Sequence, residues 1–272
     1  MSEIINIPQL SNTALSLLGI SVVLCVLLPL IAVIYSFIKV KKSGKSFFYG
    51  FAAYLVAQLV IIPVLANLFL SIADFGSAYE NGSFLISSLL ALLIAILEEG
   101  TRYICFAYLL KSYRDWNSGY MFGLGYGCTG MMISGGMSAF NDLVTATAIN
   151  SGAVAELDAV SQQTFAEIAA SMAELPSLAF LMTGIDQFCI AAMSVALSIL
   201  LMEAVAANNN RMLGVTVMIR MMSLFFPLLL TGIWYWGFII ASLFLAMIAG
   251  VSIWYTVKTK KPDPGKPNFR II

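Results

Sequence analysis

Three ionisable side chains lie in the middle of a long apolar run that extends from Ser83 to Leu110. They are Glu98, Glu99 and Arg102, and a run of this length can cross a bilayer as a helix. Charged groups at that depth in a membrane helix are costly, so they must face a protein interior or a water-filled cavity rather than lipid. The chain therefore has to fold as a bundle in which other helices shield this one.

The spacing of these charges leaves a surplus of negative charge. On a helix, Arg102 is four residues from Glu98 and three from Glu99, so its guanidinium can reach either carboxylate. One guanidinium cannot neutralise both. The rest of the chain must supply a proton, a cation or a metal at this depth.

The composition is that of a polytopic membrane protein. Hydrophobic residues make up 60% of the 272 residues, 10% are charged, and the mean hydropathy is +0.93. The formal net charge is zero, so nucleic acid is not an expected partner. The four cysteines fall inside apolar runs, unlike a secreted disulfide framework. No Lys or Arg precedes the first apolar run, which predicts a retained span rather than a signal peptide.

The apolar runs predict an all-α bundle of about seven membrane spans. The expected helices cover residues 13–38, 47–72, 83–110, 120–148, 177–205, 212–230 and 233–257, with Thr231-Gly232 as a tight turn between the last two. Basic connecting segments alternate with acidic or neutral ones, and basic segments stay in the cytoplasm. Residues 1–257 then form one transmembrane domain with its N-terminus outside, and residues 258–272 form a basic cytoplasmic tail. A bacterial cytoplasmic membrane is the expected location.

The polar segment 150–176 contains four acidic residues and no base. Its apolar residues recur close to helical spacing. This pattern leaves two alternatives open: an interfacial helix that lies over the extracytoplasmic mouth of the bundle, or a loosely structured loop.

Polar groups on four consecutive expected helices lie at about one depth. A rise of about 1.5 Å per residue places Glu98 roughly 18 Å from the cytoplasmic end of its helix, and it brings Tyr126, Asp186 and Arg220 to a similar level. This agreement favours a functional site near the midplane. The alternative is a set of ion pairs, such as Asp186 with Arg220, that only fixes the register of the helices.

Glycines recur at every fourth position from Gly119 to Gly127 and let helix backbones approach closely. We expect this face to pack against the helix 83–110. That packing would hold Tyr126 and Cys128 close to the two glutamates.

The ligand chemistry does not favour a metal. The chain has no histidine, which removes the commonest zinc ligand, and the remaining ligands would be carboxylates and thiols. A serine or cysteine nucleophile would also lack a histidine base. A water molecule activated by one buried glutamate stays open. We expect no metal and no cofactor.

The charged motif resembles that of the YhfC-type intramembrane protease family, a relative of the CAAX-prenyl-processing and PrsW-like enzymes. The Glu-Glu-Gly-Thr-Arg-Tyr run at 98–103, a basic loop with Trp116, and Gly123-Leu124-Gly125 are similar to the family's Glu-Glu-x-x-Arg helix and its following Gly-Leu-Gly-His-Gly. The resemblance covers nearly the whole chain. It implies a site for peptide-bond hydrolysis within the membrane, built from glutamate, histidine and polar residues of later helices.

The chain departs from this pattern at several positions. Tyr126 stands where the family has a histidine, and Gly130 where it has a glutamate. Asp186-Gln187 replaces a Glu-Arg pair, and Arg220 falls near the place of a further histidine. A guanidinium at Arg220 would supply the positive charge that the surplus carboxylate needs.

These departures predict a pseudoenzyme with an intramembrane-protease-like fold that binds a membrane segment, a lipid or a lipidated peptide. One alternative is an active protease whose paired glutamates activate water. A second alternative is a small-solute or ion transporter, although no internal repeat is evident. The candidate catalytic residues are Glu98, Glu99, Arg102 and Tyr126. The candidate binding residues are Cys128, Asp142, Asp186, Gln187 and Arg220.

Overall fold

The computed structural model of the chain describes residues 7–40, 43–233 and 236–260. The regular elements in these ranges are all helices, which confirms the prediction of an all-α fold. They are α1 (Asn12–Lys39), α2 (Gly44–Val56), η1 (Ala57–Ile61), α3 (Ile62–Leu70), α4 (Phe75–Glu80), α5 (Phe84–Ile104), η2 (Cys105–Leu109), α6 (Trp116–Gly130), η3 (Met131–Gly136), α7 (Met137–Asn150), η4 (Ala153–Glu156), α8 (Ala159–Glu174), α9 (Ser177–Ala206), α10 (Asn210–Ile233) and α11 (Gly237–Thr259). Most of the predicted basic tail, residues 261–272, lies outside the described ranges.

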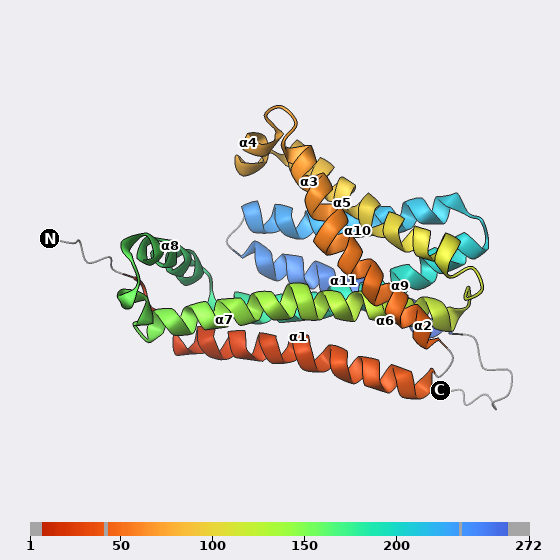
Figure 1. The fold of residues 1–272 in the computed structure, drawn as a ribbon, viewed down its shortest axis with the longest axis horizontal. Helices are drawn as coiled ribbons and strands as arrows, with labels where there is room; N and C mark the ends of the chain where they lie inside the picture. Colours follow the sequence, from red (N-terminus) through yellow and green to blue (C-terminus); the bar gives the residue numbers. More distant parts are fainter. Residues whose placement is uncertain (1–6, 41–42, 234–235, 261–272) are drawn as a thin grey trace.

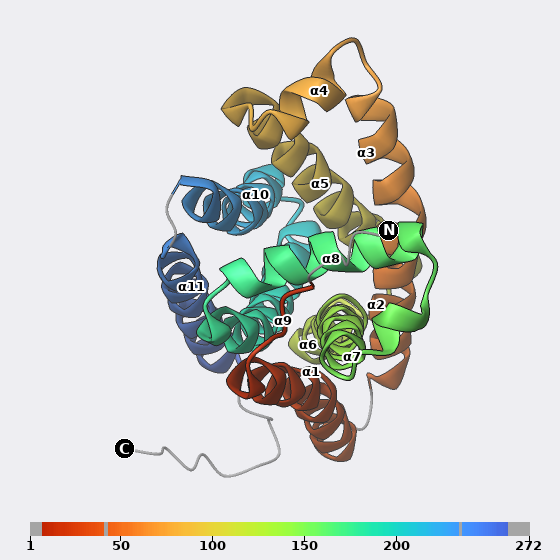
Figure 2. The same cartoon turned by 90° about the vertical axis from the view of Figure 1, so that its left-hand side faces the viewer.

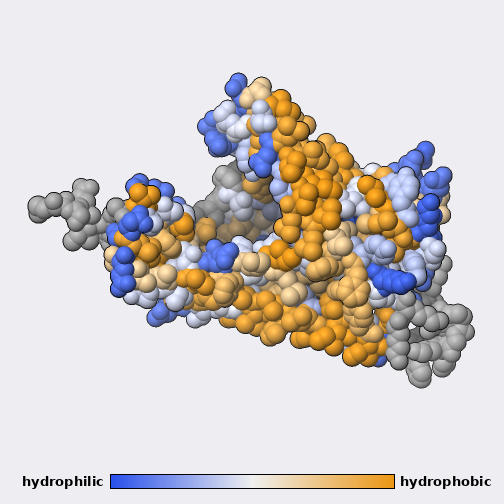
Figure 3. Space-filling model, viewed as in Figure 1, coloured by the Kyte–Doolittle hydropathy of each residue, from blue (hydrophilic) through white to orange (hydrophobic). Residues whose placement is uncertain are grey.

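Six helical segments are long and apolar enough to cross a membrane, by length and composition. They are Asn12–Lys39, Gly44–Leu70, Phe84–Leu109, Ser177–Ala206, Asn210–Thr231 and Gly237–Thr259. Most of the helices run along the long axis of the molecule (Figure 1), and hydrophobic residues cover much of the face between its hydrophilic ends (Figure 3). These properties confirm that the chain is a polytopic membrane protein.

The expected span at 120–148 is less hydrophobic than the other six. It is helical throughout, because α6, η3 and α7 follow one another from Trp116 to Asn150, and it lies beside α1 (Figures 1 and 2). Its many glycines, serines and threonines lower its hydropathy, so it is not among the six apolar segments. The count of seven spans and the orientation in the membrane stay predictions.

The glycine-rich face of α6 packs against α9, and the expectation that it packs against the helix 83–110 is wrong. A Cβ added at Gly123 would lie 2.6 Å from the Cα of Val195 in α9. On the opposite side of α6, a Cβ added at Gly125 would overlap the carbonyl group of Phe47 in α2. Small residues therefore let α6 lie tightly between two helices, and their spacing does not say which helices these are.

The expected turn at Thr231-Gly232 is also wrong. α10 continues to Ile233, and the Thr231 hydroxyl donates a hydrogen bond to the Pro227 carbonyl at 2.9 Å within this helix. α11 begins at Gly237, where an added Cβ would overlap the Leu230 carbonyl oxygen. The close approach between the two helices thus occurs at Gly237, where only a glycine fits.

The polar segment folds as η4 and α8, so the helical alternative is the correct one. Asp158 caps α8 by accepting hydrogen bonds from the backbone N–H groups of Val160 and Ser161. α8 lies across one end of the bundle (Figure 2), and its Ala169 and Met172 are buried there with residues of α1, α7 and α9. The segment is therefore an ordered cover over that end.

Candidate functional site

Four charged side chains meet inside the bundle. Glu98, Glu99 and Arg102 come from α5, and Arg220 comes from α10. Their exposed fractions are 1%, 0%, 0% and 6%, so all four are buried. Two carboxylates and two guanidinium groups give this cluster a formal charge of zero, which removes the surplus of negative charge that α5 alone would have.

Arg220 binds the Glu98 carboxylate with two of its nitrogens. Its Nε donates to Oε2, and its Nη2 donates to Oε1 at 2.8 Å. Gln58, from the π-helical stretch η1, also donates to Oε1, at 2.6 Å. Both carboxylate oxygens therefore accept hydrogen bonds, in the fork geometry that makes arginine–carboxylate pairs strong.

Arg102 connects α5 to two further helices. Its Nη1 donates to Glu99 Oε1 at 2.9 Å, and its Nη2 donates to the Ser194 hydroxyl of α9 at 3.3 Å. The guanidinium also lies over the ring of Tyr126 in α6, with 4.0 Å between its Cζ and the ring centroid. This is a cation–π contact in a dry environment, where such contacts are strongest.

Several polar atoms of this cluster are buried without a hydrogen-bond partner among the described residues. They are Glu99 Oε2, Arg102 Nε, Tyr126 Oη and Arg220 Nη1. Buried polar atoms normally have a partner, and small buried polar sites commonly hold ordered water. These atoms are therefore the places in the cluster where a water molecule would bind.

Asp186 and Gln187 do not join the cluster. Asp186 accepts a hydrogen bond from the Ser242 hydroxyl of α11 at 3.0 Å, and Gln187 packs against Gly135. Ser194, which does reach Arg102, lies about two helical turns farther along α9. The expectation that Asp186 lies at the depth of the cluster is thus wrong, and so is the alternative in which Asp186 pairs with Arg220.

Cys128 and Asp142 also lie elsewhere. Cys128 packs with Met121 and Leu124 on the face of α6 that meets α1, so the expectation that it lies close to the glutamates is wrong. All four cysteines of the chain are free and buried. Asp142 is half-buried on α7.

Two residues of the site were missed by the sequence reasoning. Gln58 binds Glu98, and Ser194 binds Arg102. A glutamine in the middle of a largely apolar span is a usable signal, because an amide is costly to bury in a membrane without a partner. A serine carries no such signal, since serine is common where membrane helices pack closely.

The fold and the cluster define a class: a helical integral membrane protein with paired acids and arginines buried between its spans. The family described as YhfC intramembrane metalloprotease matches residues 24–245, so the chain belongs to that family. This confirms the resemblance noted in the sequence. The chain is also similar to the membrane protein YhfC of Bacillus subtilis (strain 168), with 26% identity over 261 residues that cover 93% of this chain and 99% of that one. No solved structure matches.

The family relationship and the six apolar segments agree with the expected location in a bacterial cytoplasmic membrane. The matched range contains every member of the charged cluster. The family's description also implies a metal.

The residues of the cluster do not fit a divalent metal. Both oxygens of Glu98 and one oxygen of Glu99 already accept hydrogen bonds from side chains. Two guanidinium cations lie beside these acids and would repel a metal ion. A catalytic zinc needs three protein ligands, yet nowhere in the described part of the chain do three His, Cys, Asp or Glu side chains come together. The sequence has no histidine to complete such a set.

Proposed function

We propose that the chain is a YhfC-family protein that binds an acyl chain within the membrane and does not hydrolyse peptide bonds. The observation that carries this proposal is the contact between Arg220 and both oxygens of Glu98. A guanidinium supplies the positive charge that a metal would supply, but it has no open coordination position and cannot generate a metal-bound hydroxide.

The state of Glu98 also argues against acid–base catalysis by this residue. A general base must offer a free oxygen to the proton that it removes. Both oxygens of Glu98 are occupied by Arg220 and Gln58. Glu98 is therefore a structural group in this chain.

The proposed binding site for the acyl chain is an apolar groove between α9, α10 and α11. The groove has a volume of about 390 Å³, and its lining includes Leu197, Ile219, Phe244 and Met247. Such a groove between membrane spans takes up hydrocarbon, because lipid tails are the medium around it. At the C-terminal end of α11, Lys258 lies with its Nζ 4.4 Å from the ring centroid of Trp254, a lining residue. A cation there fits an anionic headgroup above the acyl chain.

Mass spectrometry of the protein in nanodiscs tests this binding. A Leu197→Trp variant should fill the groove and lose the co-purifying acyl species that the unmodified chain retains. Leu243→Trp is the matched control, because Leu243 is 65% exposed on α11 and does not line the groove. Equal retention by the two tryptophan variants would refute the groove as the binding place. In separate experiments, the protein is supplied with either a lipid or a lipidated peptide, and the one that is retained identifies the source of the acyl chain.

A second candidate function, an active protease, rests on one observation. Glu99 Oε2 has no hydrogen-bond partner among the described residues, so a water molecule bound to it could be activated by Glu99. Incubation of the purified protein with membrane-peptide substrates separates the two functions. The binding proposal expects no cleavage; cleavage that is present in the unmodified chain and lost in Glu99→Gln would establish the protease.

A further inference from the structure

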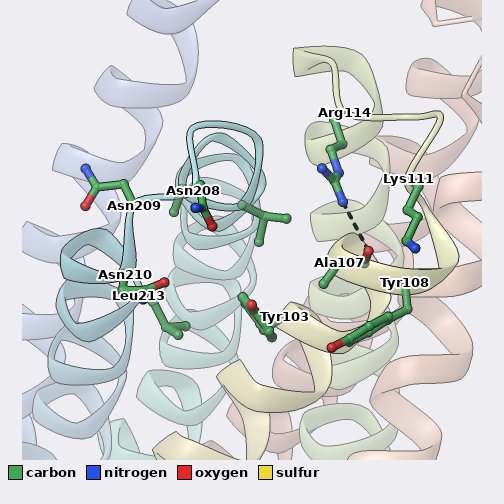
Figure 4. A pocket seen from close by; sticks show the side chains of 11 residues that line it. Tyr103, Ala107, Tyr108, Lys111, Arg114, Asn208, Asn209, Asn210 and Leu213 are labelled. Atoms are coloured by element: carbon green, nitrogen blue, oxygen red, sulfur yellow. Dashed lines mark hydrogen bonds between the residues drawn. The ribbon is translucent and has the colours of Figure 1, made fainter.

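A second cavity lies at the end of the molecule opposite α8. It has a volume of about 250 Å³ and is bounded by residues of η2, the segment after it and the connection from α9 to α10. Figure 4 shows Lys111 and Arg114 on one side of it and the asparagines 208–210 on the other. The proposed function above makes no use of this cavity.

The charged residues that line this cavity are both cations. They are Lys111 and Arg114, and no carboxylate lines it. Neither cation forms an ion pair with a residue in the described ranges. No carboxylate of the described residues therefore neutralises either cation by direct contact.

Arg114 is held in position by the backbone. Its Nε donates to the Phe106 carbonyl at 3.2 Å and its Nη2 donates to the Ala107 carbonyl at 3.1 Å, as the dashed line in Figure 4 marks for Ala107. These bonds leave Nη1 as a free donor. A guanidinium that is fixed before a ligand arrives loses less side-chain entropy on binding than a mobile one.

The opposite wall supplies neutral donors. Asn208 has a φ of 53°, a left-handed conformation that asparagine tolerates, and it turns the chain between α9 and α10. The Oδ1 atom of Asn209 accepts a hydrogen bond from the backbone N–H of Arg211 at 3.1 Å, so its amide NH₂ group is left to donate elsewhere. The cavity thus has two cations on one side and three asparagines on the other.

The cavity lies beside the end of an apolar segment, where the boundary between lipid and water is expected. Lys111 lies two residues after the end of the apolar segment Phe84–Leu109, and the tyrosines 103 and 108 line the cavity beside it. Tyrosine and lysine together are typical of the boundary between lipid and water. An anion could enter from either side of that boundary.

We propose that this cavity binds a phosphate group through Lys111, Arg114 and the asparagine amides. Donors on two walls suit a tetrahedral anion with several acceptor oxygens better than a planar carboxylate. The phosphate belongs to a phospholipid headgroup or to a soluble phosphate, because both present anionic non-bridging oxygens that accept hydrogen bonds.

The test measures binding to the full-length protein in two settings. One uses inorganic phosphate and glycerol phosphate with the protein in neutral detergent, and the other uses nanodiscs that contain phosphatidylglycerol in phosphatidylcholine. Binding in detergent supports a soluble phosphate, and retention of phosphatidylglycerol alone supports a lipid headgroup. Binding of neither overturns the proposal.

Variants tie the binding to the cavity. Lys111→Gln with Arg114→Gln should weaken phosphate binding about tenfold or more, because charge-assisted hydrogen bonds are lost. Lys39→Gln is the matched control: Lys39 also ends a span and lies 5.8 Å from a tyrosine ring centroid, as Lys111 lies 5.7 Å from that of Tyr108. Equal binding by the double variant and the control would refute the site.

Asn209→Asp keeps the proposal testable if the double variant does not fold. This change retains the oxygen that caps α10 and adds a negative charge to the cavity. It should weaken phosphate binding by a similar factor without loss of the fold. Unchanged binding in this variant would count against the site as strongly as an unaffected double variant.

Discussion

A carboxylate that is buried between membrane helices must find a cation or take up a proton, and in this chain Glu98 finds Arg220. Glu99 is paired separately with Arg102. Each acid thus has its own arginine, and the two pairs do not exchange partners in the structure. Removal of one partner leaves a buried charge uncompensated, which is far more destabilising than removal of both.

Arg220→Ala should therefore lower the free energy of unfolding by about 3–5 kcal/mol. The expected rescue is specific: Glu98→Gln should recover much of the loss in the double variant, and Glu99→Gln should not. Thermal unfolding in detergent measures both effects. Lys39→Ala, which removes a cation at the end of α1, is the control and should stay within about 0.5 kcal/mol of the unmodified chain. Rescue by both glutamine variants would show that only total charge matters.

The sequence predicts much of this cluster but not its full membership. The surplus on α5 follows from charge counting, and the depth count together with the family resemblance predicts that Arg220 supplies the compensating cation. Counting residues along the helix puts Asp186 at the level of the cluster, but the depth of a residue does not fix the direction in which its side chain points, and Asp186 binds Ser242 instead. Gln58 is a polar side chain in a largely apolar span, which predicts that it needs a partner, but the sequence does not say that this partner is Glu98.

Among the helices, the fit of α6 depends on its glycines. At Gly123 an added Cβ would lie 2.6 Å from the Val195 Cα, a backbone atom that cannot move aside. At Gly100 of α5, by contrast, an added Cβ would meet nothing within 4 Å. The two glycines therefore make a matched pair.

Gly123→Ala should destabilise the protein by about 1–3 kcal/mol, because it forces α6 and α9 apart. Gly100→Ala should be neutral or stabilising by roughly 0.5–1 kcal/mol, since alanine favours the helix. Chemical denaturation of both variants in the same detergent measures the difference. Similar effects from the two alanines would contradict the packing described for α6.

The cap of α8 gives an element-scale prediction about pH. The Ser161 side chain donates a hydrogen bond to Asp158, and together with the backbone N–H groups it holds the pKa of this carboxyl below its ordinary value. The contribution of the cap is therefore complete above the ordinary aspartate pKa of about 3.9 and is lost as the pH falls through the lowered value.

Hydrogen exchange of residues 159–174 measures this loss. Exchange in α8 should accelerate at low pH beyond the intrinsic pH dependence, and Asp158→Ala should show fast exchange at neutral pH as well. Asp158→Asn keeps an accepting oxygen but does not titrate in this range, so its exchange should not depend on this transition. A pH response retained by Asp158→Asn would assign the effect to another group.

At the scale of the whole molecule, the two ends differ. α8 covers one end, and the phosphate cavity lies at the other. The alternation of basic and acidic connections predicts that the α8 end is outside the cell and the cavity end is in the cytoplasm. This orientation depends on the number of spans. Basic and acidic connections alternate between the two sides only if the segment 116–150 also crosses the membrane.

Cysteine labelling in intact cells measures the orientation. Ser151→Cys, at the α8 end, should react with a membrane-impermeant maleimide, and Asn208→Cys, at the cavity end, should react only after the cells are opened. The native cysteines are buried, so they give a low background. Labelling of both positions in intact cells would refute the seven-span prediction.

The distance between Glu98 and Arg220 along the chain, 122 residues, also has a consequence for synthesis. Membrane helices are inserted in the order in which the ribosome makes them, so α5 enters the bilayer long before its counter-ion exists. Until α10 is made, Arg102 is the only cation of the described cluster that can neutralise the two acids of α5. Only the arrival of α10 completes the neutral charge cluster, so we expect a chain truncated before α10 to keep an uncompensated carboxylate in its interior.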